Sequence, residues 1–217
     1  MKIRITQLAG TTALLCAIQP AAHAHVEFVD NTAEAGRSFI ATANIAHGCE
    51  DESGHYDTYK VEIELPAGIT ARPMNSPVGA ASVDDSGEPV KLVWQRDPAE
   101  AAAHDELFYQ VSFRFSVPNT PLESLEFRTT QYCAGGTQLA WEGAEVPTLR
   151  IVPRHVTGWN KYTAQADISL ATLQAMFADA QIVWANNQAY SPNPVVSTLI
   201  QNALTVIPAG TDYWVKY

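Results

Sequence analysis

The most chemically distinctive position in this sequence is His25, which follows two closely spaced alanines in the stretch PAAHAHVEF, residues 20–28. Cleavage after Ala24 would make His25 the first residue, with two nitrogens, the α-amine and the imidazole Nδ1, for one metal ion. The α-amine has a reference pKa of roughly 7.7–8.0 and imidazole of roughly 6.5, so both can lose their protons near neutral pH, as metal binding requires. Cu(II) favours such nitrogen and oxygen ligands and leads the divalent affinity order. The position therefore predicts a Cu(II) site at a processed N-terminus.

The segment before His25 has the layout of a secretory signal peptide. It contains two cations within its first four residues, continues through the apolar run LAGTTALLCAI, and ends in small residues at Ala22 and Ala24. This is the three-part arrangement that precedes an A-x-A cleavage site. The apolar run is far shorter than the roughly 20 residues of a permanent membrane helix. We therefore expect residues 1–24 to be removed, which leaves a periplasmic or secreted protein without a membrane span.

A carboxylate close to His25 would complete the metal site, and the sequence offers two. Strand alternation puts Glu27 on the same face as His25, whereas Asp30 can reach back only if the strand bends there. We expect one of them, Asp30 ahead of Glu27, to supply the oxygen ligand. Only Met74 and Met176 remain after the signal is removed, so a thioether site selective for Cu(I) is not expected.

Four further histidines decide whether the site holds one imidazole or two. They are His47, His55, His104 and His155. His47 lies beside a cysteine and His104 precedes an apolar segment, and neither of the other two has a partner at ligand spacing, so we expect structural roles. If one of the four met His25 in space, the site would be a two-histidine brace, as in oxidative copper enzymes.

Cys49 and Cys133 are the two cysteines that remain after the signal is removed. In an oxidising compartment such an even number predicts a disulfide bond. The loop-entropy description gives a long bridge of this kind about 4–5 kcal/mol of stabilisation. A thiolate metal site is the less favoured alternative, because two isolated cysteines without a CxxC spacing cannot complete a sulfur cage.

The chain is acidic. Removal of the signal takes away two of its 13 Lys and Arg residues and none of its 23 Asp and Glu residues, which leaves a net charge of −12. Nucleic acid and anionic membrane surfaces are poor partners for such a protein. The charge is compatible with cation binding, although solubility alone would explain it.

The scaffold that must position these groups is expected over residues 25–153. Segments rich in aromatic and β-branched residues alternate there with turn sequences such as PAGIT, SPVGAA, DDSGEP, VPNTP and AGGT. Seven short strands in about 130 residues predict a mainly β domain, an antiparallel sandwich of immunoglobulin or cupredoxin type. The expected strands are HVEFV, SFIATANI, YKVEIEL, VKLVW, LFYQVSFRFSV, LEFRTTQY and TLRIV. The acidic stretch EDESGHYD, residues 50–57, is expected to be a solvated loop.

After Pro153 the pattern changes to a smaller unit, residues 154–217, which we expect to be an α+β module. GWNKYT, QIVWA and TDYWVKY have the composition of strands. Between the first two, DISLATLQAMFADA predicts a helix with either Asp167 or Ser169 as its N-cap. Its apolar face would contain Leu170, Leu173 and Phe177. A unit of fewer than about 70 residues has a marginal core, so we expect it to pack on the first domain.

Five motifs occur in order along the chain: HV directly after the A-x-A site, HGCE at 47–50, PM followed by a second Pro at 73–77, HDELFYQ at 104–110, and QYC-AGG-TQLAW at 131–141. In this combination residues 25–152 resemble the YcnI-like copper-binding family, formerly catalogued as a bacterial domain of unknown function. The resemblance implies an exported β-sandwich that binds Cu(II) through the N-terminal histidine in a single-histidine brace, with a nearby carboxylate and a tryptophan.

The tryptophan that the resemblance implies is Trp141, on the strand after Cys133. Its indole would shield the metal and tune its redox accessibility, because an indole nitrogen is a hydrogen-bond donor only and no strong ligand. A core tryptophan would have the same local sequence, so a purely structural role stays open. The C-terminal unit resembles small modules that start with GWN and end in a YWVK strand, a similarity that implies no chemistry.

These observations predict a copper-binding protein of copper homeostasis or trafficking, and not an enzyme. It would take up Cu(II) and release it by ligand exchange to another exported copper protein, such as a chaperone or an oxidase assembly factor. Two alternatives stay open: a two-histidine copper oxidase or monooxygenase, and a metal-free module that presents a surface to protein or glycan. Hydrolytic and nucleotide chemistry are not indicated, because the chain has no GxSxG, P-loop, HExxH or dinucleotide fingerprint.

Overall fold

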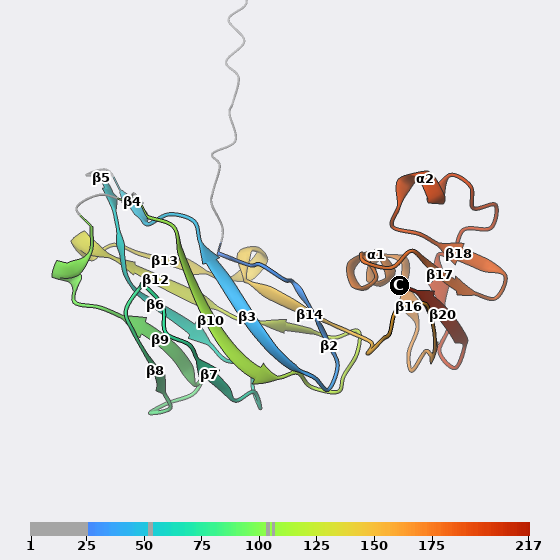
Figure 1. Cartoon of the computed structure of the whole chain (residues 1–217), viewed down its shortest axis with the longest axis horizontal. Helices are drawn as coiled ribbons and strands as arrows, with labels where there is room; N and C mark the ends of the chain where they lie inside the picture. The colour runs from blue at the N-terminus through green and yellow to red at the C-terminus, as the bar shows by residue number, and fades with distance from the viewer. Residues whose placement is uncertain (1–25, 52–53, 103–104, 106) are drawn as a thin grey trace, which may run out of the picture.

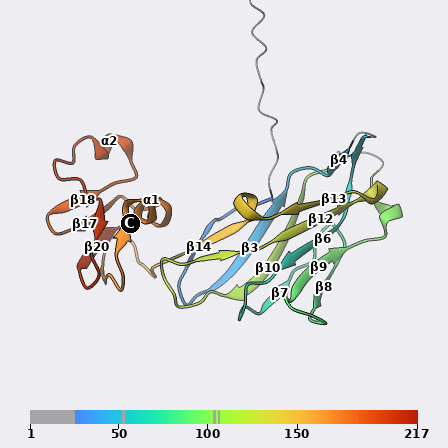
Figure 2. The same ribbon diagram turned by 180° about the vertical axis from the view of Figure 1, so that it is seen from behind.

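The computed structural model of the chain describes residues 26–51, 54–102, 105 and 107–217. Two antiparallel sheets packed face to face make up most of the first domain (Figure 1 and, from behind, Figure 2). In their order across the sheet, the strands of the first sheet are β1 (Glu27–Phe28), β3 (Ser38–Ile45), β10 (Tyr109–Ser116) and β7 (Ala71–Pro73). The second contains β13 (Gln138–Trp141), β12 (Thr129–Cys133), β6 (Thr58–Glu64), β9 (Lys91–Gln95) and β8 (Ala80–Asp84).

The N-terminal segment contributes a strand to each of two sheets. β1 pairs with β3 in antiparallel fashion, and after a bend β2 (Thr32–Glu34) pairs in parallel with β14 (Thr148–Val152). β14 in turn pairs with β11 (Ser124–Glu126). The remaining described elements of this domain are the hairpin β4 (Cys49–Asp51) and β5 (Gly54–Tyr56) and the 3₁₀ turns η1 (Pro98–Glu100), η2 (Ala134–Gly136) and η3 (Gly143–Glu145).

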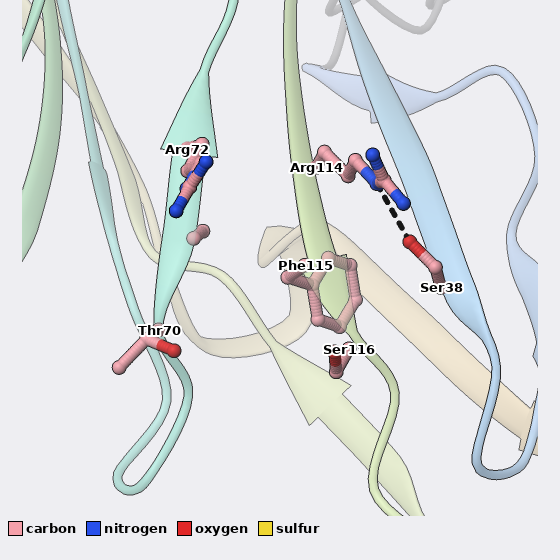
Figure 3. Close-up of a pocket in the computed structure, with 7 residues that line it drawn as sticks. Ser38, Thr70, Arg72, Arg114, Phe115 and Ser116 are labelled. Atoms are coloured by element: carbon pink, nitrogen blue, oxygen red, sulfur yellow. Dashed lines mark hydrogen bonds between the residues drawn. The ribbon is translucent and has the colours of Figure 1, made fainter.

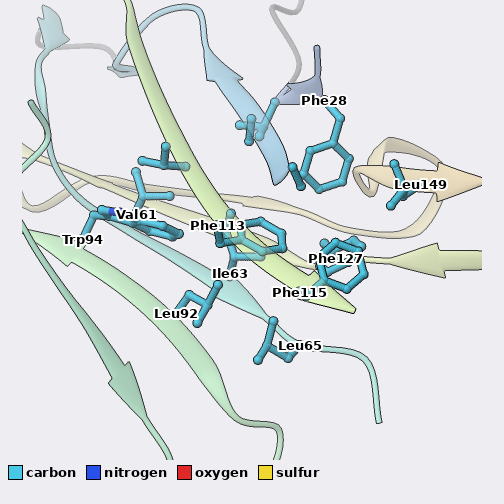
Figure 4. Packing of buried hydrophobic residues seen from close by; sticks show 14 of the residues in the cluster. Phe28, Val61, Ile63, Leu65, Leu92, Trp94, Phe113, Phe115, Phe127 and Leu149 are labelled. Carbon is cyan, nitrogen blue, oxygen red and sulfur yellow. The ribbon is translucent and has the colours of Figure 1, made fainter. Parts of the chain in front are cut away.

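An aromatic cluster lies at the centre of the sandwich. Alternate residues of β10 point into the core, as the period of two along a strand requires. Ring centroids in the cluster are 5.2–6.2 Å apart, in edge-to-face and tilted arrangements (Figure 4). Its members are Phe28, Phe113, Phe115 and Phe127. Such pairs add about 0.5–1.5 kcal/mol each beyond the burial of their surface, so Phe28 fastens the short strand β1 to both layers.

The predicted fold class, a mainly β antiparallel sandwich followed by a small α+β module, is confirmed. SFIATANI and TLRIV form β3 and β14 with the predicted bounds. LEFRTTQY, predicted as one strand, is divided between β11 and β12, because the chain moves from one sheet to another at Phe127 and Arg128. SPVGAA, predicted as a turn, already contains the start of β8.

The prediction of a solvated loop over residues 50–57 is wrong. The described residues of this stretch form the end of β4 and the whole of β5, and Asp57, which follows β5, is fully buried. Two constraints explain the difference. Cys49 at the start of β4 is tied to Cys133 by a disulfide bond, and Asp57 is the centre of a buried hydrogen-bond network.

The C-terminal module surrounds a second, separate cluster of buried side chains. Its main sheet contains β15 (Trp159–Thr163), β20 (Asp212–Lys216), β17 (Ile182–Ala185) and β18 (Gln188–Tyr190), in that order. The other elements are α1 (Leu170–Met176), α2 (Pro194–Ser197) and the strand pair β16 (Ile168–Ser169) and β19 (Val206–Ile207). No helix in the described part of the chain is long and apolar enough to cross a bilayer.

Helix α1 confirms one of the two predicted caps. The Ser169 hydroxyl accepts a hydrogen bond from the Thr172 backbone N–H at 3.2 Å, whereas Asp167 accepts one from the Ala209 N–H at 2.8 Å. Leu173 and Phe177 are buried, as predicted, whereas Leu170, predicted for the same face, is exposed. α1 therefore covers one face of the module's sheet, and the opposite face carries no helix (Figure 1, Figure 2).

The two units meet at a small joint beside β14. Leu122 of the first domain packs against the core of the module. His155 stacks on Tyr217 with ring centroids 3.6 Å apart, and its Nδ1 lies 3.5 Å from Oε1 of Glu34 in β2. Burial raises the pKa of the Tyr217 phenol, so this ring stays neutral at physiological pH and contributes to the joint as an apolar surface.

Candidate metal-binding site

The chain enters the sandwich directly after the predicted processing site. Val26 and Phe28 are 3% and 7% exposed, while Glu27 between them is exposed. Pairing with β3 places Glu27 opposite Asn44. His25 and the predicted signal peptide lie outside the described residues, so the proposed ligand itself stays a prediction. What the structure shows is that the segment beginning at Val26 is fixed to the core by alternate side chains.

The two candidate carboxylates lie on either side of the end of β1. Glu27 is on the outer face of the first sheet, in a row with Asn44 and Gln110, whose side-chain amides are hydrogen-bonded at 2.9 Å. Asp30 lies in the bend between β1 and β2. Both are exposed, and neither carboxylate forms an ion pair or hydrogen bond with another described residue. Their oxygens are therefore accessible to a ligand, and the choice between them stays a prediction.

Trp141 is the last residue of β13, opposite Thr129 of β12. It is 6% exposed and belongs to the same buried cluster as Val26 and Phe28. β1 and β13 are each the first strand of their sheet, and β7 at the far end of one sheet contacts β8 and β9 at the far end of the other. β1 and Trp141 therefore share one edge of the sandwich.

At this edge the candidate groups point in different directions. Glu27 faces solvent on the outside of the first sheet, and Trp141 faces inward. Trp141 therefore lies close to the start of the described chain, but the Glu27 carboxylate does not lie against the indole of Trp141. The buried position of Trp141 is consistent with both of its predicted roles, as a core residue and as a shield for a metal at the edge.

Two carboxylates that the sequence analysis did not single out lie near the same edge. Glu142 follows Trp141 directly, and Glu145 lies four residues after Trp141 in the turn η3. This turn lies beside the start of the described chain in both views (the gold turn in Figure 1 and Figure 2). Both side chains are exposed. Their proximity to β1 depends on the pairing of β14 with β2, which is remote in sequence and could not be read from local pattern.

The three described histidines, His47, His55 and His155, are distributed over the molecule. His47 is half-buried three residues beyond Asn44, next to the disulfide, and its carbonyl accepts a hydrogen bond from Gln131 at 2.7 Å. His55 is exposed with Nδ1 3.9 Å from a carboxylate oxygen of Glu50, and the third lies at the interdomain joint. His104 is outside the described residues. Over the described ranges no three His, Cys, Asp or Glu side chains are grouped as metal ligands.

The predicted disulfide bond is confirmed. Cys49 and Cys133 are bonded, with their Cα atoms 5.8 Å apart, and both are buried. Their sulfurs are consequently not available as thiolate ligands, which removes the alternative of a sulfur site. The bond joins β4 to the last residue of β12. It thereby stabilises the part of the sandwich that lies beyond the C-terminal end of β3.

Next to the disulfide lies a buried ionic network that sequence reasoning missed. Nη2 of Arg96 is 2.6 Å from Oδ2 of Asp57, and the Tyr109 hydroxyl donates to the same oxygen at 2.9 Å. The Ala102 backbone N–H adds a third bond at 2.7 Å. Burial raises the pKa of Tyr109, and the hydrogen bond and charge of Asp57 raise it further against the lowering by Arg96. The network is fully satisfied around Asp57, which is typical of a structural role.

A shallow groove of about 570 Å³ crosses the outer face of the first sheet (Figure 3). Arg72 of β7 and Arg114 of β10 are direct cross-strand neighbours there, and Nε of Arg114 donates to the Ser38 hydroxyl at 2.8 Å. Like charges opposite each other repel, and neither arginine forms an ion pair with a described residue. The two guanidinium groups give this groove a positive charge, which does not favour a cation.

The chain is similar to several solved structures of bacterial proteins. An uncharacterized protein from Nocardia farcinica described as having an immunoglobulin-like fold is 24% identical, with a TM-score of 0.47 over 59% of this chain and 98% of that one. A putative membrane-anchored protein from Corynebacterium diphtheriae is 12% identical (TM-score 0.37, 60% and 34% of the two chains). A cohesin module of a Clostridium perfringens family 33 glycoside hydrolase is 15% identical (TM-score 0.35, 60% and 100%). No curated protein matches the chain significantly.

A sequence profile described as "Domain of unknown function (DUF1775)" matches residues 25–155. The match covers more than half of the chain and the whole sandwich, and it begins at His25, immediately after the predicted cleavage site. The chain therefore belongs to the DUF1775 family, which is the YcnI-like domain family that its motifs resemble.

Proposed function

We propose that this protein is exported and binds Cu(II) at a processed N-terminus, through the α-amine and imidazole of His25 and one nearby carboxylate. The observation that carries the proposal is that the family domain begins at His25, directly after Ala-x-Ala. A leader that ends where the domain begins gives the mature protein a free amine on a histidine. That combination is a bidentate nitrogen chelator, which Cu(II) prefers among the divalent ions of the first transition row.

The way in which the N-terminal segment is held supports the proposal. Val26 and Phe28 are buried and β1 is paired with β3, so a group attached to Val26 has a restricted position. Preorganisation of this kind lowers the entropic cost of metal binding. The confirmed disulfide supports export, since such bonds persist in oxidising compartments.

We infer that the protein acts in copper homeostasis or trafficking, as a carrier and not as an enzyme. The candidate oxygen ligands Glu27, Asp30 and Glu145 are all exposed, so an incoming ligand from another protein can reach a metal bound near them. Metal transfer by ligand exchange requires this access. The partner would be another exported copper protein, a chaperone or an oxidase assembly factor.

The test compares two forms of the full-length protein made by secretion: one processed after Ala24, and one with four extra residues, Gly-Pro-Gly-Ser, before His25, in which proline prevents the added peptide nitrogens from forming a new copper chelate. Intact mass establishes the processing site, and Cu(II) titration followed by electron paramagnetic resonance reports stoichiometry and ligands. The processed form should bind one Cu(II) tightly, and the extended form should lose this site because its histidine nitrogen is in a peptide bond. Equal copper binding by both forms, or by neither, would refute the proposal.

One observation supports a second candidate, a two-histidine copper oxidase or monooxygenase. β3 runs antiparallel to β1, and His47 lies just beyond the β3 residues that pair with β1. Among the described histidines it is therefore the nearest in strand register to the start of the chain. Replacement of His47 by Gln distinguishes the candidates: loss of one nitrogen coupling from the copper resonance indicates a second imidazole, and an unchanged spectrum indicates a single-histidine brace.

A further inference from the structure

The sheet face of the C-terminal module that α1 does not cover carries three exposed tryptophans. Trp159, Trp184 and Trp214 are 53%, 47% and 39% exposed and together line a hollow of about 340 Å³. They come from the neighbouring strands β15, β17 and β20. We call this face the tryptophan face.

Exposure of these side chains is not a consequence of a missing core. The other face of the same strands supplies Val183, Tyr213 and Val215, which are 0–2% exposed in a closed apolar cluster. Alternation along the strands then forces the tryptophans outward. Large apolar patches on a monomer surface mark binding sites, and tryptophan is the residue most enriched at positions that dominate binding energy.

The register of the strands defines the spacing of the rings. Trp184 and Trp214 are direct cross-strand neighbours, while Trp159 lies opposite Lys216, on the other side of β20. Adjacent strands are about 4.8 Å apart and positions two residues along a strand about 6.8 Å apart. Trp159 and Trp184 are two strands and two residues apart, so the rigid sheet holds their Cα atoms about 12 Å apart. Rings at this spacing can contact different sugar units of one chain. The carbon-bound hydrogens on the face of a pyranose ring are positively polarised and pack favourably on the negative face of an indole.

The geometry also argues against an extended peptide as the ligand. β20 is paired on both sides, with β15 and β17, so the middle of the tryptophan face has no free backbone groups with which a peptide could form a strand. What the face offers is three aromatic planes, their indole N–H groups and two lysine amines. Ring stacking combined with hydrogen bonds at the periphery is the mode of recognition that sugars require.

Charge indicates which sugars fit. Residues 154–217 contain three of the chain's 13 Lys and Arg residues and three of its 23 Asp and Glu residues, so the module is neutral within an acidic protein. Lys161 lies over the Trp214 ring at 5.4 Å and pairs with Asp212 at 2.6 Å. Lys216, opposite Trp159, has no ion pair in the module, all of which is described. A cation without a partner beside the rings complements a ligand carboxylate.

We propose that the tryptophan face binds a polysaccharide that contains uronic acids, with pyranose rings stacked on the tryptophans and a carboxylate paired with Lys216. This activity is independent of the copper site and would hold the protein on an acidic surface glycan. Residues 25–153 are not required for recognition in this scheme, but the test uses the full chain.

The experiment titrates the full-length protein with a hexameric alginate fragment and follows tryptophan fluorescence and heat of binding. Cellohexaose, a proline-rich decapeptide and anionic lipid vesicles are the comparison ligands. W184A and W214A should each weaken alginate binding about tenfold or more, as loss of a stacking contact at a binding hot spot does. The matched control is L199A, which removes a 76% exposed side chain of the same module outside the hollow and should leave binding unchanged.

The Lys216→Gln variant tests the choice of an acidic sugar. It should weaken alginate binding severalfold and reduce its dependence on salt. Equal binding of cellohexaose and alginate would overturn the assignment of an acidic ligand. The absence of binding to either sugar, or binding only to the peptide or the vesicles, would overturn the proposal as a whole. Copper titration of the same variants should be unchanged, so failure here leaves the copper site untouched and failure of the copper site leaves this result intact.

Discussion

Glu27 and Trp141 lie at one edge of the sandwich and face in different directions, Glu27 toward solvent and Trp141 into the core. If a metal is bound at the start of the chain, the carboxylate of Glu27 and the indole of Trp141 would therefore approach it from different sides. The turn η3 after Trp141 adds Glu145 to the same edge. Three carboxylates, those of Glu27, Asp30 and Glu145, are therefore candidates for the oxygen ligand.

The first prediction concerns that ligand. One of the variants E27Q, D30N and E145Q should weaken Cu(II) binding about tenfold or more, because it replaces an anionic oxygen by a neutral amide in the first coordination sphere. The other two should bind as the unmodified protein does, since exposed carboxylates outside the site contribute little. Competition titration against a chromophoric chelator measures the affinities. Unchanged affinity in all three variants would contradict a ligand from this edge.

The second prediction concerns Trp141. The W141F variant should keep one Cu(II) per protein, since an indole nitrogen is not a strong ligand. If the indole shields the metal, the rate at which ascorbate reduces bound Cu(II) should change. The loss of the Cu(II) resonance over time measures this rate. The control is W214F in the module, and an identical reduction rate in W141F and this control would assign Trp141 to the core alone.

A third prediction follows from the buried network beside the disulfide. Asp57→Asn leaves the guanidinium of Arg96 buried without its counter-charge, and removing one partner of a buried pair typically costs about 3–5 kcal/mol of unfolding free energy. Urea denaturation followed by circular dichroism measures the loss. Asp85→Asn, at an exposed turn position, is the control and should be neutral. Similar unfolding midpoints for the two variants would show that the network does not stabilise the fold.

The fourth prediction is a pH dependence at Glu62. Burial opposes ionisation of this carboxyl, but hydrogen bonds from Lys60 and Lys91 and their charges outweigh it and lower its pKa below the ordinary value of 4.5. The Lys60 and Lys91 amines lie 2.5 and 3.1 Å from its two oxygens. Because the folded-state pKa is lowered, the stabilisation is present above pH 4.5 and is lost as the pH falls through the folded value.

Glu62→Gln should therefore be less stable than the unmodified protein at pH 7, and the difference should shrink below pH 4.5. Thermal melts between pH 3 and 7 give the comparison. Glu64→Gln, on the same strand, is the matched control because its carboxylate forms no ion pair with a described residue. A difference that is independent of pH would show that packing, and not charge, is responsible.

The fifth prediction concerns the disulfide bond. Cys49 and Cys133 are 84 positions apart, so the double serine variant should lose about 4–5 kcal/mol in the loop-entropy description. Guanidinium unfolding of the two proteins measures the difference. If reduction of the unmodified protein lowers the unfolding midpoint as much as the serine variant does, the bond is responsible. An unchanged midpoint after complete reduction would contradict this account.

The sequence correctly predicted those elements that depend mainly on interactions between residues close together in the chain. β3 and β14 are rich in apolar and β-branched residues that largely alternate with polar ones, and their predicted bounds were correct. The Ser169 cap was visible because its partner is only three residues away. The disulfide followed from cysteine number and compartment. In each case the deciding interaction lies within a short segment or needs only composition.

The errors arose where distant pairing overrides local composition. Acidic residues 50–57 have the composition of a loop, yet Asp57 is buried because Arg96 and Tyr109, far along the chain, neutralise and hydrogen-bond its carboxylate. Glu145 of η3 could not be predicted as a candidate ligand for the same reason, since the contacts of β14 with β2 and β1 bring it to the edge that carries β1. Burial of a charge depends on partners that no window of sequence contains.

The parallel pairing of β2 with β14 has a mechanical consequence. β2 belongs to the first strands of the domain and β14 is its last, and backbone hydrogen bonds of 2.8 Å from Arg150 to Asn31 and 3.0 Å from Ala35 to Val152 extend the pair at both ends. A pulling force between the N-terminus and the module would draw the two strands in opposite directions and load these bonds together. The sandwich would therefore resist this tension by shear of the paired strands. A protein tethered through its C-terminal module would keep its N-terminal strands paired while the tether was under load.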